Sequence, residues 1–140
     1  MSTSKAKAEW RDGLKSGAGT MGSSHIEPVS FSLKKRLSEE AGSSPEEFLG
    51  AALCGCFSMA LAAALERESA TPKHVSTEAH VRLERDEVGL KIAAIALVTK
   101  ARVENIEPAK FAHIVRATKE SCPVAKALLG TSVTVDASLV

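Results

Sequence analysis

Two cysteines of this chain occupy positions where a sulfur atom could do chemistry. Cys56 lies in a long apolar stretch, and Cys122 stands directly before Pro123. A thiolate is a good nucleophile, and oxidation turns it into a sulfenic acid that a second thiol converts to a disulfide. The two cysteines therefore fit the roles of an attacking and a resolving thiol. The alternative for Cys56 is a small core residue, because free cysteine is among the most often buried residue types.

A reactive Cys56 needs a cation nearby, because apolar surroundings disfavour the charged form of a thiol. Arg36 is the cation that we expect, and the carboxylate of Glu46 could hold its guanidinium by bidentate hydrogen bonds. Glu46 precedes Cys56 by ten residues, which is about 15 Å of helical rise, so their side chains should not touch. Either the arginine bridges this distance or a partner subunit contributes.

Cys122 is the N-cap of a short helix if Pro123 is the first residue of that helix. Unpaired N–H groups and the positive helix end stabilise a thiolate at such a position. The alternative is a cysteine in an ordinary Ser-Cys-Pro turn. Whether the two sulfurs meet is not readable from the sequence, since a disulfide requires Cα atoms within about 7 Å.

Cys54 lies two residues before Cys56, about 200° around a helix, and we interpret it as core packing. The same geometry argues against a Cys-x-Cys metal site. The four histidines are scattered and lack zinc-ligand spacing. We therefore expect neither a metal nor another cofactor.

A long central helix must position Cys56. Ser44 can cap it, Pro45 suits its first position, and Glu47 completes a capping box, so we predict a helix from Pro45 to about Arg67. Residues 48–65 carry no charge, a length that raises the question of a membrane span. The weakly hydrophobic composition of this segment and its acidic flanks favour a helix buried in a protein core.

Alternating apolar and polar residues predict strands on both sides of this helix. The predicted strands are residues 6–11, 16–22, 28–37, 74–85, 90–103 and 133–139, with two further helices beginning at Pro108 and Pro123. This order indicates a single α+β domain over residues 1–140, with mainly antiparallel sheets around the central helix. The helix is too apolar for one sheet face to cover, which favours a homodimer that buries it.

The composition limits the classes of partner. With 18 basic and 17 acidic residues, a net charge of +1 and 4% aromatic residues, the chain offers no footprint for nucleic acid or an anionic membrane. Its N-terminal segment lacks the apolar core of a signal peptide, so we expect a cytoplasmic protein. Thiols are kept reduced there, and its three cysteines are then reactive or core residues rather than permanent disulfides.

Two segments closely resemble motifs of a known family. Residues 43–65, SSPEEFLGAALCGCFSMALAAAL, resemble the central-helix signature of the OsmC/Ohr family of osmotically inducible and organic-hydroperoxide-resistance proteins. Residues 121–128, SCPVAKAL, resemble its second-cysteine motif, and the opening segments around Trp10 and residues 17–20 are also similar. The sequence GCFSMAL at residues 55–61 favours the OsmC branch, and so does the spacing of Arg36 from the helix-starting Pro45.

The resemblance implies a thiol-dependent peroxidase that reduces organic hydroperoxides to alcohols. Cys56 matches the peroxidatic cysteine, Cys122 the resolving cysteine, Glu46 the arginine-orienting glutamate, and Arg36 the arginine, with Lys35 as its competitor if the alignment slips by one. The resemblance also implies an intertwined α+β homodimer with two active sites at the subunit interface. The oxidised enzyme would be restored by an external dithiol, which could be a lipoylated protein.

Two other interpretations of the function remain open at this point. A non-catalytic redox sensor or thiol-ligand binding protein could use the same scaffold. A cysteine acyl-transfer enzyme ranks last, because no histidine is placed as a base beside Cys56. Phe57 and Met59 are expected in the core, although they could also line an apolar pocket that favours organic peroxides.

Overall fold

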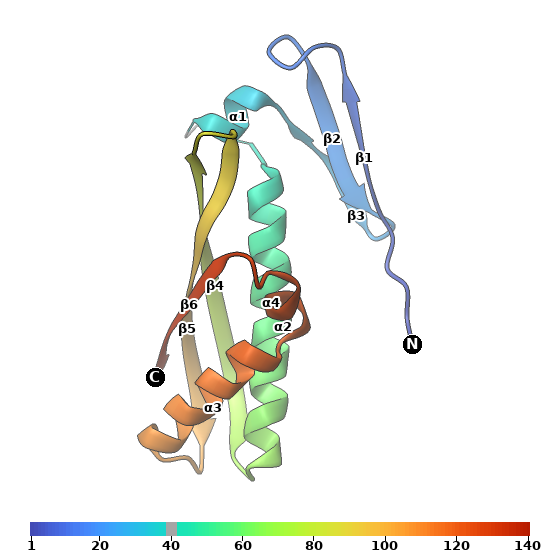
Figure 1. Cartoon of the computed structure of the whole chain (residues 1–140). Coiled ribbons are helices and arrows are strands. Elements are labelled where there is room, and N and C mark those ends of the chain that lie inside the picture. The colour runs from blue at the N-terminus through green and yellow to red at the C-terminus, as the bar shows by residue number, and fades with distance from the viewer. Residues whose placement is uncertain (39–41) are drawn as a thin grey trace. The chain divides into compact units, whose positions relative to one another are not determined.

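A computed structural model describes residues 1–38 and 42–140 of the chain. Its elements follow in the order β1 (Ala6–Arg11), β2 (Ala18–Ser23), β3 (Ile26–Phe31), α1 (Leu33–Leu37), α2 (Pro45–Arg67), β4 (Thr71–Arg85), β5 (Leu90–Glu104), α3 (Pro108–Ser121), α4 (Pro123–Ala127) and β6 (Ser132–Leu139) (Figure 1). They form two compact units, Met1–Phe48 and Leu49–Val140, each of which is described by itself. The single domain expected from the sequence stays a prediction.

The first unit holds a three-stranded antiparallel sheet in the order β1-β2-β3. Gly19 in β2 pairs with Trp10 on one side and Phe31 on the other. A Cβ atom on Gly19 would lie 2.8 Å from the Phe31 ring and 2.9 Å from that of Trp10, so only glycine leaves room here. The two rings meet across β2, with their centroids 5.4 Å apart, which is the normal range for an aromatic pair.

The strand predicted for residues 28–37 is wrong in its second half. Strand β3 ends at Phe31, and Leu33–Leu37 form the short helix α1. The cause is Ser32, whose Oγ accepts a hydrogen bond from the Lys35 backbone N–H at 3.2 Å and so caps the helix. Arg36 therefore projects from a helix and not from a strand.

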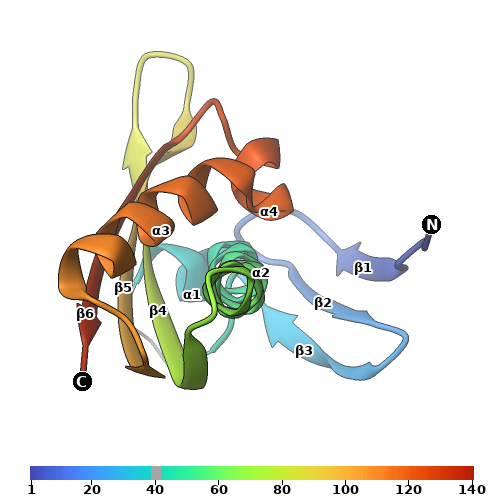
Figure 2. The same ribbon diagram turned by 90° about the horizontal axis from the view of Figure 1, so that it is seen from below.

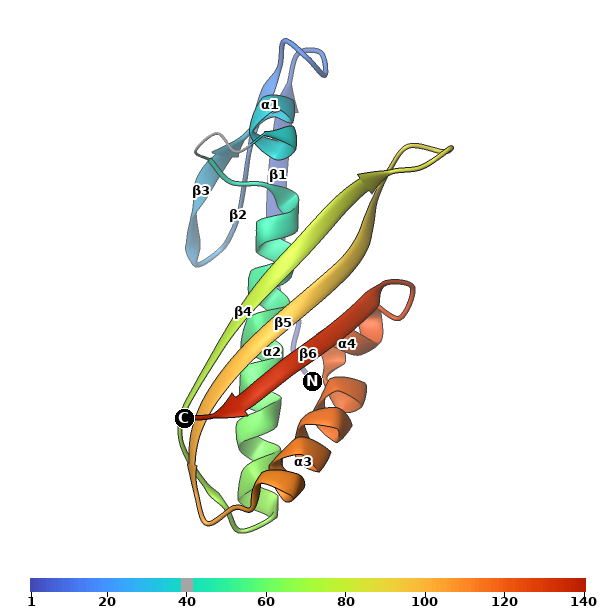
Figure 3. The same ribbon diagram turned by 90° about the vertical axis from the view of Figure 1, so that its left-hand side faces the viewer.

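The second unit is a three-stranded sheet with helices on one face. Strands β4 and β5 form a long antiparallel hairpin, and β6 joins β5 in parallel. Helices α2 and α3 lie on the same side of this sheet, and the other face is uncovered in this unit (Figures 2 and 3). Side chains alternate along β6 between half-buried apolar and exposed polar residues, as the sequence predicted. The mainly antiparallel α+β class is confirmed, with β5–β6 as the parallel pair.

Helix α2 begins at Pro45 and ends at Arg67, as predicted. Leu53, Phe57, Leu61 and Leu65, spaced four residues apart, are fully buried in the core. Among the described residues α2 is the one helix whose length and composition would also suit a membrane span. Because its large apolar side chains pack into the chain's own core, it behaves as a core helix.

The rest of the α2 surface is less covered within the chain. Ala51, Ala52 and Gly55 are exposed, and Met59 is 73% exposed. The helix predicted to be buried all around is thus buried on one face in the single chain. An exposed apolar row of this kind usually marks a surface that another molecule covers.

A chain of hydroxyl groups ties α2 to the sheet beneath it. Ser58 Oγ donates to Thr77 Oγ1 on β4 at 2.8 Å, and Thr77 Oγ1 lies 3.0 Å from Thr99 Oγ1 on β5. Thr99 is fully buried, so its hydroxyl needs this partner inside the protein. The network holds the side of α2 opposite Cys56 against the sheet, because Ser58 is two residues further along the helix.

Candidate active site

The sulfur atoms of Cys56 and Cys122 meet between α2 and the α3–α4 corner. The Cys122 thiol donates to Cys56 Sγ, with 3.0 Å between the two sulfur atoms, and both cysteines are free. A disulfide bond is about 2.05 Å long, so the pair could be joined by a movement of about 1 Å. The arrangement is that of a reduced thiol pair ready for oxidation to a disulfide.

The backbone of Cys122 is held from both sides. Its N–H donates to the Thr118 carbonyl at the end of α3, and its carbonyl accepts from the Lys126 N–H of α4, both at 2.9 Å. Cys122 is therefore the N-cap of α4, as expected if Pro123 is the first residue of that helix. Its side chain is fully buried. The sulfur consequently has one fixed position, and that position faces Cys56.

The surroundings of the Cys122 thiol act on its pKa in opposite directions. Burial raises the pKa most strongly, and the nearby backbone N–H of Ala125 at the start of α4 lowers it. The neighbouring Cys56 raises it further, and the backbone N–H of Val124 lowers it. The net effect is a raised pKa, so Cys122 rests as a thiol.

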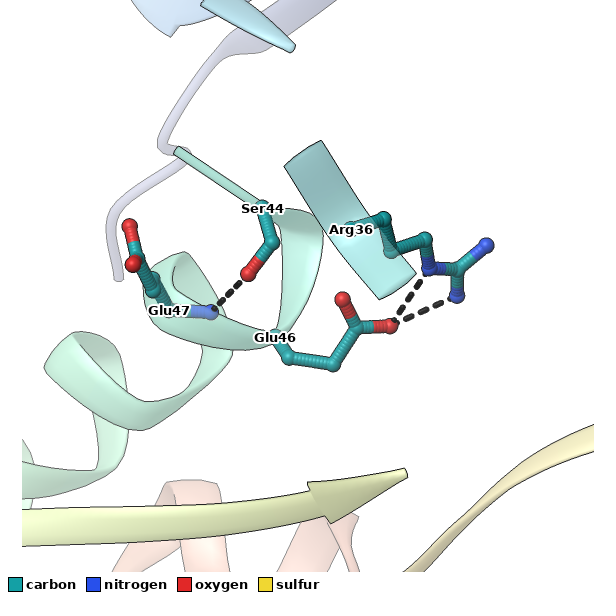
Figure 4. A network of polar contacts seen from close by, with 4 residues as sticks. All are labelled: Arg36, Ser44, Glu46 and Glu47. Carbon is teal, nitrogen blue, oxygen red and sulfur yellow. Dashed lines mark hydrogen bonds and ion pairs between the residues drawn. The ribbon is translucent and has the colours of Figure 1, made fainter. Parts of the chain in front are cut away.

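Arg36 and Glu46 form an ion pair in the first unit (Figure 4). Arg36 Nε and Nη2 both donate to Glu46 Oε1, at 2.9 Å and 2.6 Å. Glu46 lies in the first turn of α2, where Pro45 begins the helix and the Glu47 N–H donates to Ser44 Oγ at 3.2 Å. The glutamate thus holds the guanidinium through one oxygen, and not through the two-oxygen fork expected from the sequence.

The carboxylate of Glu46 is 92% buried, and only one of its two oxygens accepts hydrogen bonds. No described residue donates a hydrogen bond to its buried Oε2 atom. A buried polar atom without a partner is uncommon in proteins and often marks a functional position. Arg36 is only partly buried, so the pair combines a fixed carboxylate with an accessible cation.

Lys35, the alternative cation, has another partner. Its Nζ donates to Ser30 Oγ at 2.9 Å in an exposed position. The cation that pairs with Glu46 is therefore Arg36. The structure groups the four predicted residues into two pairs, Arg36–Glu46 in the first unit and Cys56–Cys122 in the second. That Arg36 and not Lys35 acts on Cys56 stays a prediction.

An apolar pocket of about 240 Å³ opens beside Arg36 in the first unit. Its lining consists of Trp10, Leu14, Phe31, Ser32, Leu33, Arg36 and Pro45. The sequence did not predict this pocket, although two of its few aromatic residues, Trp10 and Phe31, lie on the strands that precede Arg36. Phe57, considered as a pocket residue, is fully buried in the core, whereas Met59 is exposed on α2.

Cys54 lies apart from this chemistry. It is half-buried and packs against the core, in agreement with its interpretation as a packing residue. Burial raises its pKa, and the negative charge of Glu78 raises it further. Over residues 1–38 and 42–140 no cluster of three histidine, cysteine or acidic side chains could hold a metal ion.

Comparisons with known proteins point to one family. Residues 38–138 match the family model described as OsmC-like protein. Peroxiredoxin OsmC of Escherichia coli is 34% identical over 137 residues, covering 96% of this chain and 95% of that protein. Among solved structures, OhrB of Bacillus subtilis, an organic hydroperoxide resistance protein, has a TM-score of 0.75 at 24% identity and covers 96% of this chain and 98% of its own. An OsmC-like protein of unknown function from Vibrio cholerae has a TM-score of 0.77 at 16% identity, covering 99% and 100%.

Proposed function

Because the chain belongs to the OsmC-like protein family, we propose that it reduces organic hydroperoxides to alcohols, with Cys56 as the attacking thiol. Its relative in Escherichia coli is named Peroxiredoxin OsmC, and the chain is a cysteine-based peroxide reductase of the same kind. The observation that carries the finer proposal is the 3.0 Å contact between the sulfurs of Cys56 and Cys122. Once one of two thiols this close is oxidised, the other can form a disulfide with it.

The proposed oxidation has two steps. The Cys56 thiolate attacks the terminal oxygen of the hydroperoxide, the O–O bond breaks, and the alkoxide leaves as an alcohol after taking up a proton. Cys56 is then a sulfenic acid. The Cys122 sulfur attacks the Cys56 sulfur, the S–O bond breaks, and water leaves with the formation of the disulfide. The short sulfur–sulfur distance supports a fast second step.

Arg36, held by Glu46, would stabilise the thiolate and orient the peroxide. An arginine suits this task because it stays charged when partly buried and presents several donors in a fixed plane. Cation stabilisation of the charge that develops on the leaving oxygen would add to the rate. Because ten residues of helix separate Glu46 from Cys56, about 15 Å, we propose that the pair acts on Cys56 of a second copy of the chain.

A homodimer through α2 would bring these groups together. Ala51, Ala52 and Gly55 form an exposed row of small residues on α2, and small side chains let two helices approach closely. If two copies of α2 cross in antiparallel direction at Ala51, Glu46 of one copy lies opposite Cys56 of the other, because residue 51 is midway between them. Such a dimer would also cover the exposed apolar surface of α2.

The pocket beside Arg36 supports an organic substrate. The rings of Trp10 and Phe31 and the side chains of Leu14 and Leu33 could receive the alkyl or aryl part of a hydroperoxide, while Arg36 meets its polar end. Hydrogen peroxide would gain nothing from the apolar lining. We therefore propose a preference for bulky organic hydroperoxides over hydrogen peroxide.

The cycle would close when an external dithiol reduces the disulfide by thiol–disulfide exchange. A lipoylated protein is the reductant that the resemblance implies. A redox sensor on the same scaffold would be oxidised once without sustained turnover. Consumption of cumene hydroperoxide over many equivalents with dihydrolipoamide supports the peroxidase, whereas a single equivalent consumed per chain supports the sensor.

A further inference from the structure

A further pocket lies in the second unit, where α3, α4 and the start of β6 meet. Its volume is about 350 Å³, larger than that of the pocket beside Arg36. Figure 3 shows α4 and the turn after it beside the start of β6. Of the described residues that line this pocket, none belongs to α2. The pocket therefore lies outside the α2 surface that the proposed dimer would cover.

The wall of this pocket is apolar and fixed. Ala125, Leu128 and Val133 line it, and all three belong to the hydrophobic core or pack against it. Two backbone hydrogen bonds hold the turn between α4 and β6. The Leu128 N–H donates to the Ala125 carbonyl at 3.0 Å, and the Thr131 N–H donates to the Leu128 carbonyl at 2.9 Å. The pocket is therefore formed in the absence of a ligand, which is typical of small-molecule sites.

Two lysines bring positive charge to this apolar wall. Lys119 comes from the last turn of α3 and Lys126 from the last turn of α4, and both line the pocket. Within the described part of the chain neither ammonium group has an ion-pair partner, whereas Lys110 on α3 pairs with Glu68 at 2.6 Å. Glu120 also lines the pocket, so two positive charges face one negative charge. The balance favours an anion.

We propose that this pocket binds a medium-chain aliphatic carboxylate. The chain would lie along Leu128 and Val133 and cover Leu129, which lines the pocket and is 84% exposed. The carboxylate would accept charge-assisted hydrogen bonds from Lys119 and Lys126. Burial of the aliphatic chain would supply most of the affinity, because exposed ion pairs contribute little. The volume suits a small ligand, since ligand pockets span about 300–1,000 Å³.

The two lysines have an alternative role at the ends of their helices. A cation in the last turn of a helix offsets the negative end of the helix dipole. That role accounts for each lysine separately, but not for their meeting at one apolar wall. The two roles differ in what a lysine substitution changes. The helix role predicts a loss of stability with unchanged binding, and the ligand role predicts a loss of affinity.

The test measures the binding of decanoate to the reduced full-length chain by isothermal titration calorimetry. Octanoate should bind more weakly, by up to about fourfold for each CH₂ group lost. Decylamine, the same chain with a cationic head group, should not bind. In amide NMR spectra decanoate should shift the signals of residues 119–133 and leave those of the first unit in place.

Three variants separate the charges of the pocket. Lys119→Met/Lys126→Met should weaken decanoate binding about tenfold, because it removes both charged donors. Glu120→Gln should strengthen it about twofold, since a repelling charge is removed. Lys100→Met is the matched control and should leave the affinity unchanged, because Lys100 is an exposed lysine of β5 outside the pocket.

Failure of decanoate to bind the wild type would overturn the proposal. Equal affinities for decanoate and decylamine would also overturn it, and so would an unchanged affinity in the double lysine variant. A lower melting temperature of that variant with unchanged affinity would assign the lysines to the helix ends. The measurements use no peroxide, so their outcome does not depend on the proposed peroxidase activity.

Discussion

Cys122 donates its thiol hydrogen to the sulfur of Cys56 across 3.0 Å, from a helix corner 66 residues further along the chain. The contact joins the middle of α2 to the start of α4. Because each cysteine is fixed by regular backbone hydrogen bonding, the pair is preorganised for one reaction, the formation of their own disulfide.

Substitution of each cysteine should have a distinct result. Cys56→Ser should abolish turnover of cumene hydroperoxide, because it removes the nucleophile. Cys122→Ser should still consume one equivalent rapidly, after which Cys56 has no resolving thiol and should accumulate as sulfenic and then sulfinic acid. Rapid mixing and intact mass measurement distinguish these states. Wild-type turnover in both variants would contradict the proposed cycle.

Arg36 should matter for the oxidation of Cys56, and its neighbour Lys35 should not. We expect Arg36→Met to lower the rate constant of Cys56 with cumene hydroperoxide by about 10²-fold, the usual effect of removing one charge-stabilising donor. Lys35→Met is the matched control and should leave the rate within about twofold, because Lys35 bonds to Ser30. Stopped-flow thiol oxidation gives both constants.

Arg36→Met also leaves the buried carboxylate of Glu46 without its partner, and an unpaired buried charge destabilises the fold. The double variant Arg36→Met/Glu46→Gln removes this charge and should fold like the wild type, as circular dichroism would show. Its rate should remain as low as that of Arg36→Met. Recovery of the wild-type rate in the double variant would mean that Arg36 only stabilises the fold.

The dimer predicted through α2 can be tested at its crossing point. Ala51→Glu places a charge on the exposed small-residue row and should convert a dimer into a monomer, since two glutamates would meet at the axis. Ala112→Glu, on an exposed position of α3, is the matched control and should leave the dimer intact. Analytical ultracentrifugation measures the mass. We also expect the monomeric variant to lose peroxide reactivity, because Arg36 then no longer reaches Cys56 of a partner.

The raised pKa of Cys122 predicts a loss of stability at high pH. Burial favours the neutral thiol in the folded chain, so below the ordinary value of 9.0 this contribution to stability is fully present. As the pH rises beyond 9.0, the unfolded chain ionises first and the contribution is lost. The free energy of unfolding of the wild type should therefore fall more steeply above pH 9 than that of Cys122→Ala. Parallel profiles from urea titrations at pH 7 to 10.5 would contradict this.

The sequence predicted the start of the central helix correctly, but not the structure of the segment that carries Arg36. Ser44 and Pro45 marked the start of α2 correctly, because capping signals are local. The strand assigned to Arg36 was wrong, because alternating residues continue past the cap at Ser32 and a five-residue helix carries little periodic signal.

Local sequence patterns do not predict which residues distant in the chain come into contact. Alternation predicted β6 as a strand, but it does not tell a parallel from an antiparallel neighbour, so the parallel pairing with β5 came only from the structure. The contact of Cys56 with Cys122 depends on how α3 and α4 pack on α2, which no local spacing encodes. Residue types suggested the pair, and tertiary packing brings it together.

The central claim is that peroxide oxidises Cys56 and that Cys122 then closes a disulfide with it. One equivalent of cumene hydroperoxide added to the reduced protein, followed by non-reducing peptide mass mapping, tests this claim most directly. The account predicts a rapidly formed Cys56–Cys122 link, with Cys54 free and the peroxide consumed. Three free thiols with the peroxide still present would contradict it.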